Sequence, residues 1–130
     1  MILLRLLGFV WALPVTLIGL VVVAFCGPSS PRWRWLGFHG VRALLEFRLA
    51  RIPGGYGAIT FGHVQGYVAP ETGPRRHEDV HTLQGDLFGI LNLPIYGVCS
   101  LISRLTGGGW YRENALERWA RAWAARKEVP

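Results

Sequence analysis

Two histidines and a glutamate in RRHEDVHTLQ, residues 75–84, form the clearest chemical pattern in the sequence. On a helix, His77 and His81 lie one turn apart on the same face, where two imidazoles can bind one metal ion at about 2.0–2.1 Å each. Glu78 follows His77 directly, and in an H-E-x-x-H pattern this carboxylate accepts a proton from a water on the metal. Gln84 falls on the same face and could orient a ligand or a substrate. The pattern predicts a catalytic zinc site.

The same charges have a simpler interpretation. Residues 75–81 could be the solvated first turns of a helix, with charges that only cap it and face water. A helical context, a third ligand available downstream and a strand upstream favour metal binding over this alternative.

A catalytic zinc ion needs a third protein ligand and an open fourth position. The last predicted helix offers two carboxylates one turn apart, Glu113 and Glu117. Glu113 falls in the first turn, where an acidic residue also stabilises the helix dipole. Glu117 falls in mid-helix beside a tryptophan face, where a charge needs a partner. These positions favour Glu117 and leave Glu113 as the rival.

Three further side chains could stabilise the charge that develops during hydrolysis. His63 lies on a predicted strand among apolar residues, so a hydrogen-bonded structural role competes with a catalytic or supporting one. The phenol of Tyr96 or Tyr111 could donate to an oxyanion, or either ring could simply pack. We therefore count Glu78, His63 and Tyr96 as the catalytic candidates. His39 is expected to be exposed and to have no chemical role.

The strands that must position these residues are predicted from period-two patterns. Residues 45–49 alternate apolar and charged side chains, and residues 58–68 are rich in β-branched and aromatic ones. The loop IPGGYG separates them, so we expect an antiparallel hairpin.

Helices are predicted for the rest of the domain. Thr72-Gly73-Pro74 is typical of a helix start, and that helix would run from residue 75 to about 91. Two more are expected over 94–105 and over 111–127, the latter with its first turn at Glu113. The predicted fold class is α+β.

The N-terminal part predicts a membrane anchor. Residues 6–26, LLGFVWALPVTLIGLVVVAFC, are 21 residues without a charge, enough to cross a hydrocarbon core of about 30 Å. A cleaved signal peptide or a lipoprotein signal ending at Cys26 fits less well, because the apolar run is long and no small-residue cleavage site follows. We therefore expect a transmembrane anchor over 1–27, an interfacial linker over 28–37 and a metal-binding domain over 38–130.

The net charge, the positions of the arginines and the cysteine content indicate which partners, orientation and disulfides to expect. The formal net charge is +6, but the arginines are dispersed and no nucleic-acid-binding motif accompanies them, so anionic lipid headgroups are the expected partner and nucleic acid is not. More arginines follow residues 6–26 than precede them, which favours a single-pass protein with a cytoplasmic domain. The two cysteines lie in apolar runs, so no disulfide framework is predicted.

A second uncharged run, residues 87–103, is expected to form packed helices with one face against the bilayer.

The motifs together resemble a known class of enzymes. HEDVHTLQ followed by Asn114-Ala115-Leu116-Glu117 resembles the zincin metallopeptidases of the gluzincin type, and this resemblance implies Glu117 as the third zinc ligand. Over residues 54–120 the chain is also similar to small bacterial membrane-associated proteins with the series G-A-I-T-L-G-H, H-E-x-x-H-x-x-Q, L-P-x-Y and N-P-F-E-x-x-A. It departs from that series at Phe61, where leucine is usual, and at Ile90 and Ala115, where prolines are expected.

The sequence thus predicts a membrane-anchored zinc peptidase that cleaves a peptide or a membrane protein. The alternative is a membrane-bound module that binds metal only for stability, since small domains often need such a staple. The oligomeric state is left open.

Overall fold

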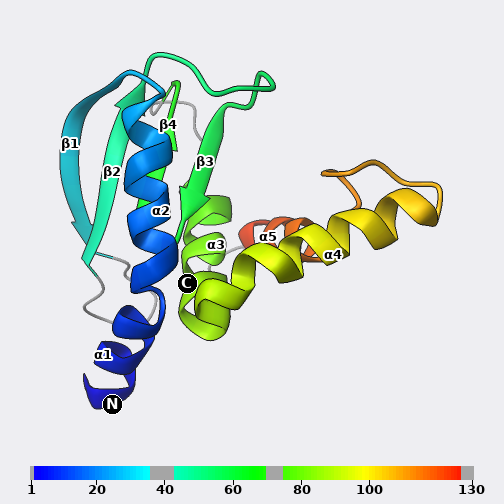
Figure 1. Cartoon of the computed structure of the whole chain (residues 1–130), viewed down its shortest axis with the longest axis horizontal. Coiled ribbons are helices and arrows are strands. Elements are labelled where there is room, and N and C mark those ends of the chain that lie inside the picture. Colours follow the sequence, from blue (N-terminus) through cyan, green and yellow to red (C-terminus); the bar gives the residue numbers. More distant parts are fainter. Residues whose placement is uncertain (1, 36–42, 70–74, 127–130) are drawn as a thin grey trace.

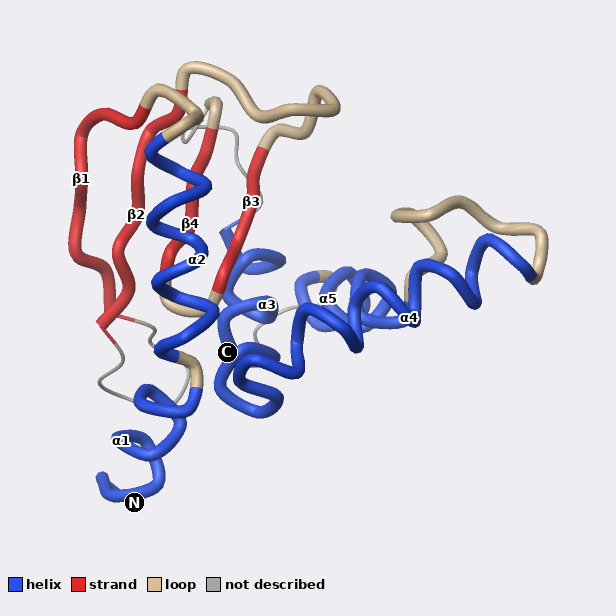
Figure 2. Tube along the Cα trace, viewed as in Figure 1, coloured by secondary structure: helices blue, strands red, loops and turns tan. Residues whose placement is uncertain are grey.

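The computed structural model describes residues 2–35, 43–69 and 75–126. Five α-helices, one 3-10 helix and a four-stranded sheet make up this part, which confirms the α+β class (Figures 1 and 2). In chain order the elements are α1 (Ile2–Trp11), α2 (Leu13–Ala24), β1 (Pro28–Trp35), β2 (Ala43–Leu49), β3 (Ala58–Phe61), β4 (Val64–Tyr67), α3 (Arg75–Phe88), η1 (Gly89–Leu91), α4 (Asn92–Leu105) and α5 (Ala115–Ala124).

The sheet differs from the predicted hairpin. Residues 58–68 fold back on themselves as β3 and β4, which pair antiparallel across the two-residue turn Gly62-His63. Gly62 has φ +56°, a conformation that glycine adopts without strain. The strand predicted over 45–49 is part of β2, and it pairs with β4 in parallel. The prediction of one antiparallel hairpin between these segments was therefore wrong, and the sheet order is β1-β2-β4-β3.

Most of the segment predicted as an interfacial linker is an edge strand. Residues 28–35 form β1, which pairs antiparallel with β2 at the edge of the sheet. Pro28 and Pro31 are compatible with this position, because an edge strand keeps one side unpaired. The register shifts between Ser29 and Arg32, next to Ser30 with φ +50°. Residues 36–42, which hold the end of the predicted linker and His39, lie outside the described residues.

The predicted N-terminal helix forms as two segments that meet at Ala12. Pro14 lies in the first turn of α2, where its missing N–H is tolerated. One side of α2 is buried against β3 and β4 through Val15, Gly19 and Val23, so this helix covers a face of the sheet (Figure 1). The hydrophobic core consists of Val23, Cys26, Leu49, Ile52 and Val64.

The helical segment that could cross a membrane lies later in the chain than the predicted anchor. Within the described ranges the helical stretch long and apolar enough to cross a membrane is Arg75–Leu105, which includes α3, η1 and α4. Length and composition alone support it, and helices in the core of soluble proteins meet the same criteria.

The helices after the sheet largely follow the prediction. α3 ends at Phe88, and η1 follows it directly. η1 begins with Gly89, whose φ of +57° is a conformation that glycine adopts without strain. α4 projects away from the sheet, and α5 packs against α3 and α4 (Figure 1). The predicted start of the last helix at Tyr111 is wrong: Asn114 is the N-cap of α5, and its side chain accepts a hydrogen bond from the N–H of Leu116 at 2.8 Å.

Candidate metal centre

The side chains of His77, His81 and Glu117 meet between α3 and α5. Nε2 of His77 lies 2.9 Å from Oε2 of Glu117 and 3.1 Å from Nε2 of His81. Nε2 of His81 lies 3.2 Å from Oε1 of Glu117. The three side chains, in the order His77, His81 and Glu117, are only 9%, 12% and 3% exposed. The i, i+4 spacing on α3 and one turn of α5 thus bring three ligand atoms to one point.

These separations suit a zinc ion. Two ligands of a tetrahedral zinc stand about 3.3 Å apart, because each bond is about 2.0–2.1 Å long. Two imidazole nitrogens and one carboxylate are also a donor set that catalytic zinc sites use. The same atoms can pair without a metal, as a hydrogen-bonded histidine–glutamate cluster. The donor set and the separations of its atoms fit a zinc ion.

Gln84 fixes the orientation of His81. Its side-chain Nε2 donates to the carbonyl of Leu116 at 3.0 Å, which leaves its Oε1 2.9 Å from Nδ1 of His81. Because an amide oxygen only accepts, Nδ1 of His81 carries a hydrogen, and Nε2 is the ring nitrogen that faces His77 and Glu117. The expectation that Gln84 orients a ligand agrees with this geometry.

Tyr96 and Asn114 support Glu117 from the other side. The Tyr96 hydroxyl donates to Oε1 of Glu117 at 2.7 Å. The side-chain amide of Asn114 donates to the carbonyl of Tyr96 at 3.0 Å and to the hydroxyl of Ser100 at 2.7 Å. The residue that begins α5 therefore also holds α4 in place.

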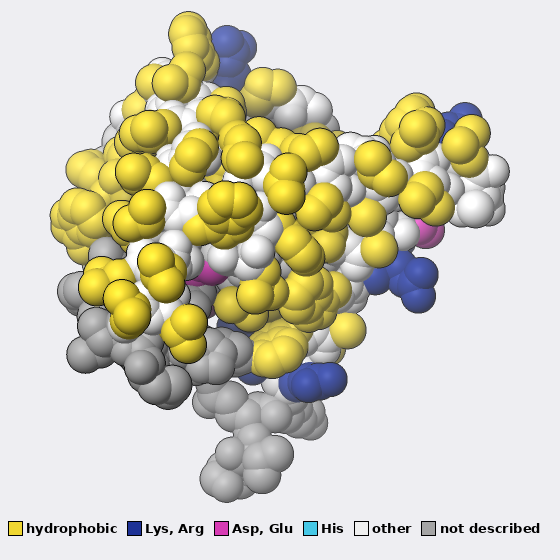
Figure 3. Space-filling model, turned by 60° about the horizontal axis from the view of Figure 1, so that its bottom comes forward, with side chains coloured by type: hydrophobic (Ala, Val, Ile, Leu, Met, Phe, Trp, Pro, Cys, Tyr) yellow, Lys and Arg dark blue, Asp and Glu magenta, His cyan; other side chains and the backbone are white. Residues whose placement is uncertain are grey.

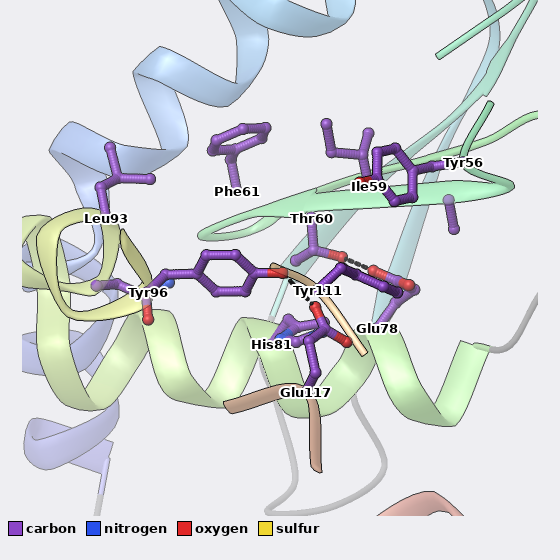
Figure 4. A pocket seen from close by; sticks show the side chains of 12 residues that line it. Tyr56, Ile59, Thr60, Phe61, Glu78, His81, Leu93, Tyr96, Tyr111 and Glu117 are labelled. Atoms are coloured by element: carbon purple, nitrogen blue, oxygen red, sulfur yellow. Dashed lines mark hydrogen bonds and ion pairs between the residues drawn. The ribbon is translucent and has the colours of Figure 1, made fainter. Parts of the chain in front are cut away.

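Glu78 lies beside the cluster and contacts β3. Its carboxylate accepts a hydrogen bond from the Thr60 hydroxyl. Figure 4 shows Glu78, His81 and Glu117 directed into one space beneath β3, with the Tyr96 ring approaching from α4. Glu78 is 4% exposed, so it is a nearly buried carboxyl group at the wall of this space.

The environment shifts the pKa values of these groups. Burial raises the pKa of the Glu78 carboxyl, and His81 and the Thr60 hydroxyl offset only part of this effect. Burial by itself would lower the pKa of the His81 ring, but the hydrogen bond and charge of Glu117 outweigh it and raise that pKa. For Glu117, burial acts upward, yet hydrogen bonds from His77 and His81 hold its pKa below the ordinary value.

The phenols near the site remain protonated. Burial, with a hydrogen bond to Glu117 as the next cause, raises the pKa of Tyr96 above its ordinary value. Burial and the charge of Glu117 raise the pKa of Tyr111 to about 12. At neutral pH both hydroxyls therefore stay hydrogen-bond donors.

A cavity of about 280 Å³ adjoins the cluster. Consecutive residues of β3 form one wall, and aromatic rings from the loops and from α4 form much of the rest (Figure 4). Its lining residues are Tyr56, Ala58, Ile59, Thr60, Phe61, Glu78, His81, Asn92, Leu93, Tyr96, Tyr111 and Glu117.

Two sequence candidates lie away from this cavity. His63 is on the β3–β4 turn, and its ring pairs with Oδ1 of Asp86 at 2.7 Å in a buried position against Phe9. It is not among the cavity-lining residues, and its surroundings match the structural alternative. Glu113 precedes α5 and accepts a hydrogen bond from the N–H of Gly109 at 2.6 Å. Its predicted place in the first turn of the helix was wrong, and it does not join the ligand group.

Sequence reasoning missed several residues of the site, and four of them carry polar side chains. Thr60, Asn92, Tyr56 and Asn114 line the cavity or hold its walls. A signal existed for Asn114, because asparagine before an apolar-periodic run is typical of an N-cap. The other three carry no local signal, since only the tertiary fold brings them to α3.

Comparisons with protein-family models, with curated proteins and with solved structures gave no match, so a function has to be inferred from the site itself.

Proposed function

We propose that this protein is a zinc-dependent peptidase of the zincin type, with zinc bound by His77, His81 and Glu117. The observation that carries the proposal is the triangle of three ligand atoms, all within 4.8 Å of one another, next to a cavity that Glu78 also lines. A purely structural metal site would usually be closed by a fourth protein ligand, whereas catalytic sites keep that position open.

The residues have distinct roles in this proposal. Bound zinc would supply Lewis acidity and lower the pKa of a water to about 7. Glu78 accepts the proton of the attacking water and returns it to the leaving amine, and its raised pKa suits a group that must do both near neutral pH. Tyr96, kept protonated, donates its single hydroxyl hydrogen to Glu117 and so positions this ligand.

Two features favour a peptide as substrate. β3 is an edge strand of the described sheet, and its four residues in a row line the cavity. Because successive side chains point to opposite faces, a wall of consecutive residues is made largely by the strand's backbone edge, which can pair with an extended peptide. Asn92 also lines the cavity, and its Oδ1 is the buried side-chain atom without a hydrogen-bond partner among the described residues. This oxygen could accept from a peptide N–H.

The second candidate is a non-catalytic metal-binding module. The contacts of Glu117 with both histidines tie α5 to α3, so a metal there could act as a staple for a small fold. Both candidates predict bound zinc, and they differ in whether Glu78 matters for turnover.

Glu78→Gln separates the two. We would measure zinc per chain together with cleavage of fluorophore-labelled casein and of a mixed fluorogenic peptide library. The peptidase proposal expects unchanged zinc and cleavage lower by about 10²–10⁴-fold. Glu113→Gln is the matched control, because it neutralises an exposed carboxylate outside the ligand group, and it should keep both properties. The wild-type protein loaded with zinc could instead cleave neither probe and need zinc only for folding. That result would support the non-catalytic module.

A further inference from the structure

One surface of the molecule is apolar over several elements. Exposed hydrophobic side chains continue from α1 and α2 across η1 to α4, and α1 and α2 both contact η1. Figure 3 shows hydrophobic atoms spread over this side with few charged ones between them. We call it the apolar face and define it by Leu4, Leu17, Val21, Val98, Leu101 and Leu105, which are 71%, 54%, 60%, 55%, 47% and 76% exposed.

The packing of these helices argues against a transmembrane span. α1 and α2 are separated by Ala12 alone, and helical hydrogen bonds continue on both sides of it, so their combined length does not by itself prevent a span. The buried side of α2 is packed on the sheet, so lipid cannot surround this helix. Arg75–Leu105 is interrupted at η1, and α3 carries buried polar groups of the metal centre. An orientation in the plane of the membrane suits these helices better than crossing it.

α2 and α4 both lie toward the viewer in Figure 1. α2 lies in front of the sheet and α4 in front of α5 in the view of Figure 1. On α4 the exposed positions Val98, Leu101, Ile102 and Leu105 follow the i, i+3, i+4, i+7 spacing of one helical face. Trp11 and Trp110, 48% and 58% exposed, add the side chains that favour the headgroup region.

The charge distribution points to lipid as the occupant. Each acidic residue in the described ranges accepts a hydrogen bond within the molecule, and most of these residues are buried. The exterior is therefore dominated by arginines, in keeping with a formal net charge of +6. Arg104 is exposed in the last turn of α4, and exposed Arg51 donates its backbone N–H to Cys26, just past the C-terminal end of α2. Cations beside an apolar surface are complementary to anionic headgroups over acyl chains.

We propose that the apolar face docks into one leaflet of a membrane containing anionic lipids, with α1, α2 and α4 in the interface and no helix crossing it. This inference goes beyond the peptidase proposal and does not depend on metal or on catalysis. It gives the uncharged runs at residues 6–26 and 87–103 one common role.

Vesicle flotation tests the proposal. The full chain, purified in mild detergent, is mixed with vesicles of phosphatidylcholine alone or of phosphatidylcholine with phosphatidylglycerol. We expect flotation that is stronger with phosphatidylglycerol. The double variant Leu101→Glu, Leu105→Glu should reduce vesicle binding at least about tenfold, because two apolar side chains no longer enter lipid. Trp33→Glu is the matched control, since Trp33 is 74% exposed on β1, outside the face, and it should float like the wild type.

Three results would overturn it. The double variant could float as well as the wild type, with circular dichroism showing both folded. Binding could be equal with and without phosphatidylglycerol, which contradicts the role of the arginines. The wild type could also stay unbound and form a concentration-dependent dimer that the double variant abolishes, in which case a second copy covers the face.

Discussion

Gln84 holds His81 in the orientation that a metal ligand needs. The 2.9 Å contact between Oε1 of Gln84 and Nδ1 of His81 turns Nε2 of the histidine toward His77 and Glu117. The other end of the same amide is anchored on the carbonyl of Leu116 in α5. One side chain therefore couples the position of α5, which carries Glu117, to the aim of His81.

Gln84→Ala should weaken zinc binding by about 10–100-fold, the usual effect of removing a residue that orients a metal ligand. Competition with a chromogenic chelator measures this change. Gln84→Glu is the informative control, because it keeps an acceptor for His81 but loses the donor to Leu116. Its zinc affinity should fall less than that of Gln84→Ala, whereas its free energy of unfolding should fall. Equal zinc affinity in the alanine variant and the wild type would show that this contact has no such role.

Thr60→Val removes the hydroxyl that donates to Glu78 while preserving the shape of the side chain on β3. We expect zinc content to stay unchanged and kcat to fall by about 10–150-fold, since the loss of one hydrogen bond to a charged group costs about 1.5–3 kcal/mol. The measurement is steady-state cleavage of the best peptide found with the library. Thr60→Ser retains the hydroxyl and should restore most of the rate. If valine and serine behave alike, Thr60 does not position the base.

Asn114→Ala should destabilise the fold, because Asn114 caps α5 and bonds to both Tyr96 and Ser100. An N-cap contributes about 1 kcal/mol and each buried hydrogen bond about 1 kcal/mol, so a loss of about 2–3 kcal/mol in the free energy of unfolding is expected. Urea denaturation of the metal-free protein gives this value. Ser100→Ala, which removes only one of the three contacts, should cost about 1 kcal/mol. A loss below about 0.5 kcal/mol for Asn114→Ala would contradict this account of how α4 and α5 are joined.

Zinc binding should weaken as the pH falls. A proton on His81 competes with the metal, and the pKa of this ring in the metal-free protein is raised by Glu117 over the effect of burial. Zinc affinity should therefore be highest above the raised pKa of His81 and should decline as the pH falls through it. Because this pKa is raised, the decline should begin above the ordinary histidine value of about 6.5. Titrations with zinc at a series of pH values follow the decline. An affinity that is constant from neutral to mildly acidic pH would be inconsistent with imidazole ligands.

The candidate ligand residues were predictable from sequence motifs, whereas the pairing of the strands was not. His77, Glu78 and His81 share one helix, so their spacing alone places them together, and Glu117 followed from the motif on α5. The parallel pairing of β2 with β4 and the strand at 28–35 depend on partners distant in sequence, and the prolines of β1 indicated a linker. His63 was associated with the site because its strand was expected to run along it, but the Gly62 turn directs it to Asp86.

Metal analysis of the purified chain tests the central claim most directly. Protein expressed with zinc and freed of loosely bound metal by gel filtration should contain one zinc per chain, and His81→Ala should contain almost none while Glu113→Gln matches the wild type. A wild-type chain without bound metal, or a His81→Ala chain that retains as much zinc as the wild type, would contradict the assignment of His77, His81 and Glu117 as a metal centre.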